Sequence, residues 1–143
     1  MKNNLFVLVF LSLIISSCSS SDGDNSNDSR LIGKWDYYQE TNIINGDEYI
    51  EVWPHACSNT KDNIEFINNG NYIESAYLNN CQLNSNNSGN GSWTLNGNNL
   101  TINIWGDIYT YQVVTLNNDI LKLKITYDIQ PGDPEHFLVF TKN

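Results

Sequence analysis

The two histidines, His55 and His136, are the side chains best suited to acid–base or metal chemistry. His136 follows Asp133 and Glu135, which together would allow a metal site, although a solvated acidic turn explains the same residues more simply. A Ser-His-Asp triad is a spatial arrangement that a sequence alone does not reveal. The chain contains no Gly-x-Ser-x-Gly elbow, no His-Glu-x-x-His motif and no phosphate-binding loop. We therefore expect no enzyme activity, no metal and no cofactor.

Cys18 has the surroundings of a cysteine that receives a lipid. It follows Lys2, the apolar run Leu5–Ile15 and two serines, which have the layout of a secretory signal ending in a bacterial lipobox. The run of about 11 residues is too short to span a bilayer, which needs roughly 20. We expect residues 1–17 to be removed and Cys18 to be acylated, which anchors the protein to a membrane. A cleaved signal without a lipid is the alternative.

Residues 18–30 are expected to form a flexible, solvated tether, because no apolar side chain follows Cys18 in this segment. Asp22, Asp24 and Asp28 have part of the spacing of a calcium loop, but the glycine and glutamate of an EF-hand are missing. The acidic residues after Cys18 are similar to export signals of surface lipoproteins in Bacteroidetes. The expected location is the cell envelope, anchored to the outer membrane, either facing the periplasm or exposed at the cell surface.

The charge of the chain argues against a nucleic-acid partner. The net charge is -9, and removing residues 1–17, which hold one lysine and no acid, leaves 6 basic and 16 acidic side chains. Nucleic-acid phosphates would repel such a protein. The 113 residues from Leu31 to Asn143 are enough for one domain with its own core.

Cys57 and Cys81 are most simply a disulfide in a protein outside the cytoplasm. Closing a loop of about 25 residues would stabilise the fold by roughly 3.5 kcal/mol. Metal binding by Cys57 with His55 is the alternative, and it lacks further ligands.

Hydrophobic periodicity predicts strands through the whole domain. Leu121, Leu123 and Ile125, for example, alternate with lysine and threonine. The expected strands are 34–44, 48–53, 63–67, 71–77, 91–95, 99–105, 108–116 and 120–128, with 135–142 as a ninth. Turn signals such as Asn45-Gly46 separate them. An all-β, antiparallel up-and-down barrel of eight strands would remove exposed sheet edges, and a β-sandwich is the alternative.

Several motifs resemble a known family. Leu31-Ile-Gly-Lys-Trp35 is similar to the start of a lipocalin, whose first strand opens with Gly-x-Trp. The wider pattern comprises Cys57, Asp62-Asn-Ile-Glu-Phe66, Gly70-Asn-Tyr72, Cys81, Gly91-Ser-Trp-Thr-Leu95 and Leu100-Thr-Ile102. It resembles the lipocalin-like domain of small Bacteroidetes lipoproteins, over about residues 31–142, which form the expected domain 31–143. The resemblance implies that Gly33 bends the first strand and that Trp35 plugs the closed end. Classical lipocalins place an arginine beside this tryptophan, and the nearest basic residue here is Lys142.

An eight-stranded barrel holds either one small ligand or its own side chains. Four tryptophans and eight tyrosines suit a site for a small hydrophobic or aromatic ligand, which needs a cavity of roughly 300 Å³ or more. The residues expected to form it are Trp35, Tyr37, Gln39, Phe66, Tyr72, Trp93, Tyr109, Tyr111 and Tyr127, with Trp105 as a further inward candidate. If these aromatics fill the barrel instead, the protein would be an interaction or accessory module that contacts a protein partner through residues 53–57 and 130–136.

Overall fold

The computed structural model describes residues 26–143, so Cys18, the expected signal and most of the expected tether lie outside the described residues. The elements are α1 (Ser26–Leu31), β1 (Gly33–Ile44), β2 (Asp47–Val52), β3 (Asn63–Ile67), the single-turn helix η1 (Asn68–Gly70), β4 (Asn71–Ser75), β5 (Gly89–Asn96), β6 (Asn99–Ile104), β7 (Asp107–Leu116), β8 (Ile120–Ile125) and β9 (Glu135–Lys142). The expected strands are confirmed to within three residues at each end. Neither helix within residues 26–143 is long and apolar enough to cross a membrane.

The sheet closes because β1 pairs with strands on both of its edges. One edge is antiparallel to β9, from Trp35 opposite Lys142 to Ile43 opposite Glu135. The other edge pairs first with β3 and then with β2. The ring therefore contains β1 and β3 to β9, which confirms the eight-stranded antiparallel barrel and excludes the sandwich.

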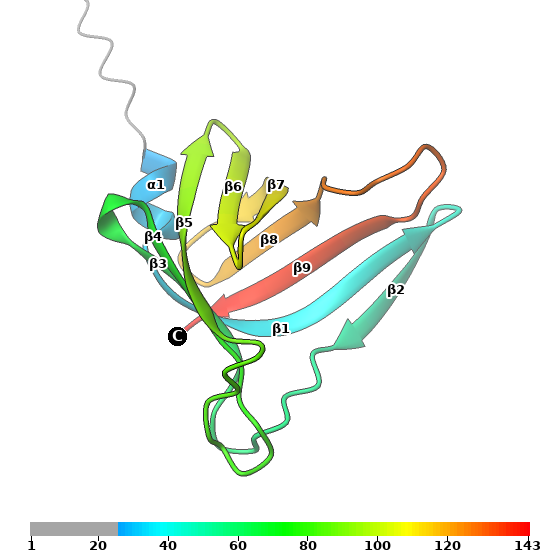
Figure 1. The fold of residues 1–143 in the computed structure, drawn as a ribbon. Coiled ribbons are helices and arrows are strands. Elements are labelled where there is room, and N and C mark those ends of the chain that lie inside the picture. The colour runs from blue at the N-terminus through cyan, green and yellow to red at the C-terminus, as the bar shows by residue number, and fades with distance from the viewer. Residues whose placement is uncertain (1–25) are drawn as a thin grey trace, which may run out of the picture.

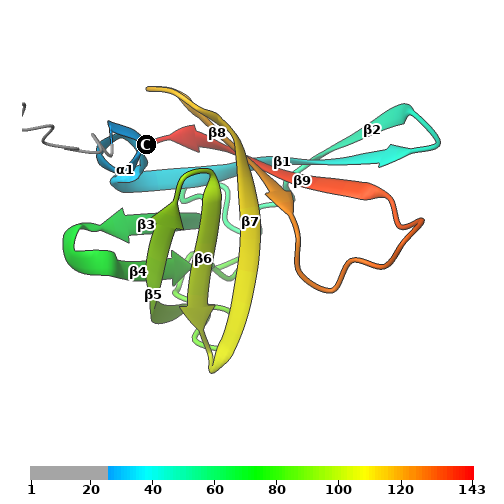
Figure 2. The same cartoon turned by 90° about the horizontal axis from the view of Figure 1, so that it is seen from above.

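The strand outside the ring is β2, so the nine expected strands are all present but the additional strand is not the last one. Residues 135–142 were expected as a ninth strand beside the eight, whereas β9 closes the ring by pairing with both β8 and β1. Every residue of β2 is exposed, because this strand pairs with β1 alone and packs on no core. The β1–β2 hairpin and the β8–β9 loop project from the end of the barrel opposite α1 (Figures 1 and 2).

The end of the barrel beside α1 is closed by a core around Trp35. Trp35 is fully buried, and its indole N–H donates to the carbonyl oxygen of Leu31 at 2.8 Å. The Nζ of Lys142 lies 4.1 Å from the centre of the Trp35 ring and donates to the carbonyl oxygen of Ile32 at 2.6 Å. Lys142, the basic residue nearest to the end of the sequence, therefore lies beside the tryptophan and makes a cation–π contact with it.

Gly33 makes the bend that precedes Trp35. Its φ is +120°, a conformation that side chains with a Cβ rarely adopt. A Cβ at this position would also lie 2.9 Å from the Nζ of Lys142. The backbone conformation therefore favours glycine here, and a side chain would also have to displace the end of Lys142.

The helix α1 corrects the end of the expected tether. Residues 26–30 are helical, although the sequence analysis placed them in a solvated linker. The Nη1 of Arg30 donates to the carbonyl oxygen of Leu116 at 3.1 Å, and the side chain of Leu31 is fully buried. The chain consequently reaches the barrel at its closed end, beside Trp35.

Candidate functional site

The opposite end of the barrel contains a cavity of about 240 Å³. Its lining residues are Tyr37, Glu40, Trp53, Tyr72, Glu74, Ile102, Ile104, Trp105, Tyr109, Tyr111, Ile125, Tyr127, His136 and Leu138. A second hollow of about 330 Å³ shares Tyr37, Trp53, Glu74 and Trp105 with it, so the two adjoin. The first cavity is smaller than the roughly 300 Å³ expected of a ligand site, so on its own it would admit only a small molecule.

Five of the expected ligand residues line this cavity, namely Tyr37, Tyr72, Tyr109, Tyr111 and Tyr127, and so does Trp105. Trp35, Phe66 and Trp93 are not among its lining residues. They belong to the buried core, where Phe66 and Trp93 pack edge to face with their ring centres 5.5 Å apart.

Gln39 does not line the cavity, because β1 contains a bulge. Tyr37 pairs with Phe140 and Gln39 pairs with Val139, so Tyr38 is one extra residue on β1. An extra residue reverses the alternation of side chains between the two faces of a strand. Glu40 consequently lines the cavity in place of Gln39.

Glu74 is the main polar group of the cavity. Its carboxylate accepts hydrogen bonds from the hydroxyls of Tyr37 at 2.8 Å and Tyr72 at 3.1 Å. Burial raises the pKa of Glu74 above its ordinary value of 4.5, although both hydroxyl bonds lower it. Burial also raises the pKa of Tyr37 and of Tyr72, so both tyrosines keep their protons and donate them.

The raised pKa of Glu74 has a consequence for stability. In the unfolded chain Glu74 loses its proton near pH 4.5, whereas in the folded protein it keeps the proton to a higher pH. The contribution of Glu74 to the free energy of unfolding is therefore fully present below pH 4.5 and is lost as the pH rises through the folded pKa. Above its folded pKa, Glu74 is a carboxylate whose burial reduces the stability of the folded protein.

Trp105 stands at the rim of the cavity in an unusual backbone conformation. Its φ is +58° and that of Gly106 is +90°, which are the signs of a type I′ turn, where Asn-Gly is the usual pair. The indole is 51% exposed, and a Cβ at Gly89 would lie 2.6 Å from its Nε1. Gly89 therefore leaves the space that the indole fills. Such conformations cost about 1–3 kcal/mol and concentrate at functional sites.

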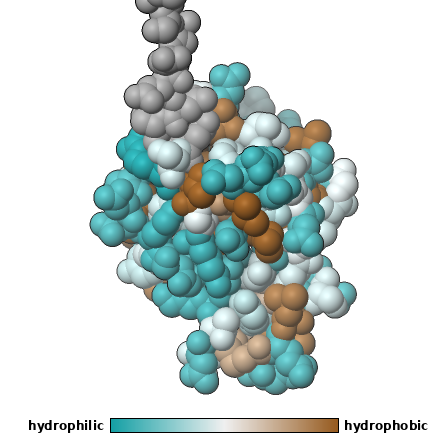
Figure 3. Space-filling view, turned by 90° about the vertical axis from the view of Figure 1, so that its left-hand side faces the viewer, coloured by the Kyte–Doolittle hydropathy of each residue, from teal (hydrophilic) through white to brown (hydrophobic). Residues whose placement is uncertain are grey.

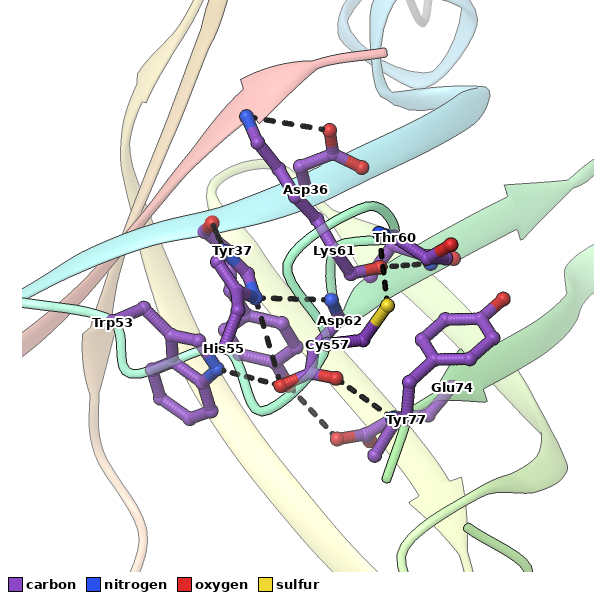
Figure 4. Close-up of polar contacts among 12 residues, drawn as sticks. Asp36, Tyr37, Trp53, His55, Cys57, Thr60, Lys61, Asp62, Glu74 and Tyr77 are labelled. Carbon is purple, nitrogen blue, oxygen red and sulfur yellow. Dashed lines mark hydrogen bonds and ion pairs between the residues drawn. The ribbon is translucent and has the colours of Figure 1, made fainter. Parts of the chain in front are cut away.

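The segment between β2 and β3, residues 53–62, contributes Trp53 to the cavity wall and is fixed in place by hydrogen bonds of Asp62 (Figure 4). The Asp62 carboxylate accepts from the indole N–H of Trp53 at 3.0 Å and from the backbone N–H of Tyr77 at 2.8 Å. The Nδ1 of His55 accepts from the backbone N–H of Asp62, so its Nε2 carries the proton and donates to the carbonyl oxygen of Tyr37 at 3.0 Å. Trp53 is thereby stacked on Tyr37 with their ring centres 4.2 Å apart. His55 has a structural role here.

A disulfide joins Cys57 to Cys81, as the sequence analysis expected. It links the segment between β2 and β3 to the loop between β4 and β5, the same two segments that Asp62 connects. Because Cys57 is bonded to Cys81 and is 2% exposed, the alternative of a metal site with His55 is excluded.

The acidic residues near His136 do not converge on it. Asp133 accepts a hydrogen bond from the backbone of Gln130, and Glu135 pairs with Lys124. The Nε2 of His136 lies 3.3 Å from the Oε2 of Glu40 at the cavity. Across residues 26–143, histidine, cysteine, aspartate and glutamate form no group of three or more that could hold a metal ion.

Comparisons with known proteins identify the family. The family model described as a lipocalin-like domain matches residues 31–123. The chain belongs to the lipocalin-like domain family. Among solved structures, apocrustacyanin C1 is similar with a TM-score of 0.54 and 14% sequence identity, over 85% of this chain and 65% of that one. This likeness concerns the fold alone, and the lipocalin-like chain spans less than two thirds of apocrustacyanin C1. No curated protein matches the sequence.

The outside of this lipocalin-like barrel offers a less suitable site. A hollow of about 500 Å³ lies beside α1 and is lined by Ser29, Ile32, Asn68, Asn69, Gly70, Trp93, Thr94 and Leu95. Most of these residues are polar or belong to turns. Figure 3 shows that hydrophilic residues dominate this face and that apolar residues gather in separate areas. The cavity inside the barrel is therefore the candidate site.

Proposed function

We propose that this lipocalin-like protein binds a small apolar or aromatic molecule in the open end of its barrel, and that a lipid on Cys18 anchors it to the outer membrane. The observation that carries the binding function is the cavity of about 240 Å³, whose walls include four tyrosines from β1, β4 and β7 and two tryptophans. Cavities with aromatic walls and few polar groups are typical ligand sites. The lipocalin-like fold is typically one of binding and transport rather than of catalysis, which agrees with the absence of a catalytic motif from the sequence.

Two observations support the anchored location. The lipobox-like sequence before Cys18 supplies the acceptor for the lipid. The described chain begins at α1, at the closed end (Figures 1 and 2). The residues that line the cavity lie at the other end. A membrane anchor that joins the domain at its closed end would leave the mouth of the cavity free for a ligand.

The binding function predicts that a small molecule accompanies the protein from its own host. Native mass spectrometry of the full chain, released from membranes and then denatured, should show the loss of a bound molecule that solvent extraction recovers. The Leu138→Trp variant fills the cavity with a larger side chain and should retain the fold but lose the molecule. An apo mass for the wild type, or equal amounts of the molecule from both proteins, would contradict the proposal.

The anchor predicts a mature chain that begins at Cys18 and carries acyl chains. Intact mass spectrometry should show this lipid mass for the wild type and no lipid mass for the Cys18→Ser variant. The two proteins differ only in the side chain of residue 18, so a difference in lipid mass can be attributed to the thiol of Cys18. A mature wild-type chain without added lipid would remove the anchor from the proposal.

A second candidate function, recognition of a protein partner, is favoured by the exposed strand β2. Tyr49, Ile50 and Val52 are each more than half exposed on this strand. The segments that the sequence analysis offered as the contact surface are less suitable, because Trp53 and His136 line the cavity. A photo-crosslinker at Ile50 that captures no envelope protein in living cells would exclude this candidate.

A further inference from the structure

We propose that the ligand is a small organic cation, an ammonium group on an aromatic or apolar body, and that the Glu74 carboxylate is its counter-ion. This inference rests on the proposed function, because it names the ligand class of the same cavity. Three features of the cavity carry it: the sign of its charges, the nature of its walls and the position of Glu74.

The charges at the cavity are acidic. Its described lining residues include Glu40 and Glu74 but neither lysine nor arginine. Asp62 is close enough to Glu74 to act on it electrostatically, and it is a third acid. The net charge of -9 adds a field of the same sign. The basic lining residue among those described, His136, already lies 3.3 Å from the carboxylate of Glu40. An anionic ligand would therefore meet repulsion here, whereas a cation would be attracted.

The walls suit the rest of an ammonium ligand. Tyr127 stands edge to face against both Tyr109 and Tyr111, with ring centres 5.0 and 5.6 Å apart. On the other side, Trp53 is stacked on Tyr37. Aromatic faces attract cations through the ring quadrupole, and tryptophan and tyrosine do so most strongly. The isoleucines of β6 and β8 provide apolar surface for the body of the ligand.

Glu74 is placed as a counter-ion would be. It is largely buried, and its hydrogen-bond donors are the neutral hydroxyls of Tyr37 and Tyr72. No described basic side chain forms an ion pair with it, so the cost of burying its charge is not offset within residues 26–143. A bound ammonium group would supply the missing positive charge and a charge-assisted hydrogen bond.

His136 provides a second polar point at the cavity. Its Nε2 is buried and has no hydrogen-bond partner in the described part of the chain, although the Oε2 of Glu40 is 3.3 Å away. Buried polar atoms normally have a partner, and a polar group on a bound ligand would provide one. The cavity therefore has one acceptor in its interior, Glu74, and a second polar pair, Glu40 with His136.

The test compares three probes with the same phenyl body and different charge. Phenethylamine is a cation, 2-phenylethanol is neutral and phenylacetate is an anion. Each is titrated by calorimetry, near neutral pH, into the mature protein held in lipid nanodiscs. We expect phenethylamine to bind at least about tenfold more tightly than 2-phenylethanol, and phenylacetate to bind least.

The Glu74→Gln variant links this preference to one side chain. It should bind phenethylamine and 2-phenylethanol about equally. It should be at least as stable as the wild type at pH values above the folded pKa of Glu74, because the buried charge is gone. The Glu48→Gln variant removes the same charge from the exposed strand β2 and should keep the preference.

The outcomes separate the inference from the proposed function. Equal or tighter binding of the neutral or anionic probe would overturn the cationic ligand while leaving a binding barrel. A preference that survives Glu74→Gln would overturn the role of Glu74. Failure of all three probes to bind would overturn the inference and count against the binding function as well.

Discussion

Replacing Trp35 with alanine is expected to lower the free energy of unfolding by about 3–5 kcal/mol, the range for large aromatic residues truncated in packed cores. Trp35 is fully buried, donates its indole N–H to Leu31 and lies under the Nζ of Lys142. Alanine would leave a cavity where β1, β9 and the end of α1 meet, and it would leave the ammonium of Lys142 without its aromatic partner. Urea unfolding followed by circular dichroism measures the loss.

The matched control is Trp105→Ala. Trp105 is half exposed at the cavity and does not belong to the buried core. Its replacement removes no buried packing and keeps a Cβ at the positive φ, so we expect a change within about 1 kcal/mol. A loss below about 1 kcal/mol for Trp35→Ala, or equal losses for both variants, would show that Trp35 does not close the barrel as described.

Strands and turns could be predicted from the sequence because their signals are local. Asn45 and Gly46 have φ values of +54° and +92°, as a tight hairpin requires, and the strands on either side occur where alternation placed them. The turn at Trp105 and Gly106 has the same geometry but was not expected. A tryptophan at its first position hides the signal, and only the following glycine shows it.

The candidate site was harder to predict, because whether an inward side chain lines the cavity depends on its position along the barrel axis. Alternation tells which side chains point inward, but inward residues near α1 form the core and those at the other end form the cavity. This explains why Phe66 and Trp93 were expected at the ligand site and belong to the core. The error at Gln39 has a different cause, since the bulge at Tyr38 depends on pairing with β9, a strand about 100 residues away in the chain.

Glu74 was missed although its sequence contains a usable signal. It stands two residues after Tyr72 on β4, so an inward Tyr72 implies an inward Glu74. Carboxylates on strands are usually exposed to solvent, so this general preference argues for an outward Glu74 although the two-residue alternation from Tyr72 places it inward. Its burial became apparent only with the pairing that places the hydroxyls of Tyr37 and Tyr72 against it.

Removing the disulfide is expected to lower the free energy of unfolding by about 3.5 kcal/mol, because Cys57 and Cys81 close a loop of about 25 residues that becomes free in the unfolded chain. The variant carries Cys57→Ala and Cys81→Ala, and both it and its reference carry Cys18→Ser so that no third thiol interferes. The ring of eight strands should persist in the folded variant, because the disulfide connects two loops and no barrel strands. Its circular dichroism spectrum should therefore match that of the reference, while its urea midpoint is lower.

Reductant provides the control for this prediction. It should lower the stability of the reference to that of the double-alanine variant, and it should leave the variant unchanged. Asp62 still joins the same two segments in the variant, through Trp53 and the backbone of Tyr77, so the folded wall of the cavity does not depend on the disulfide alone. The variant and the oxidised reference could instead prove equally stable. The loop would then already be restricted in the unfolded ensemble by these hydrogen bonds. That result would contradict the chain-entropy explanation of the disulfide's contribution.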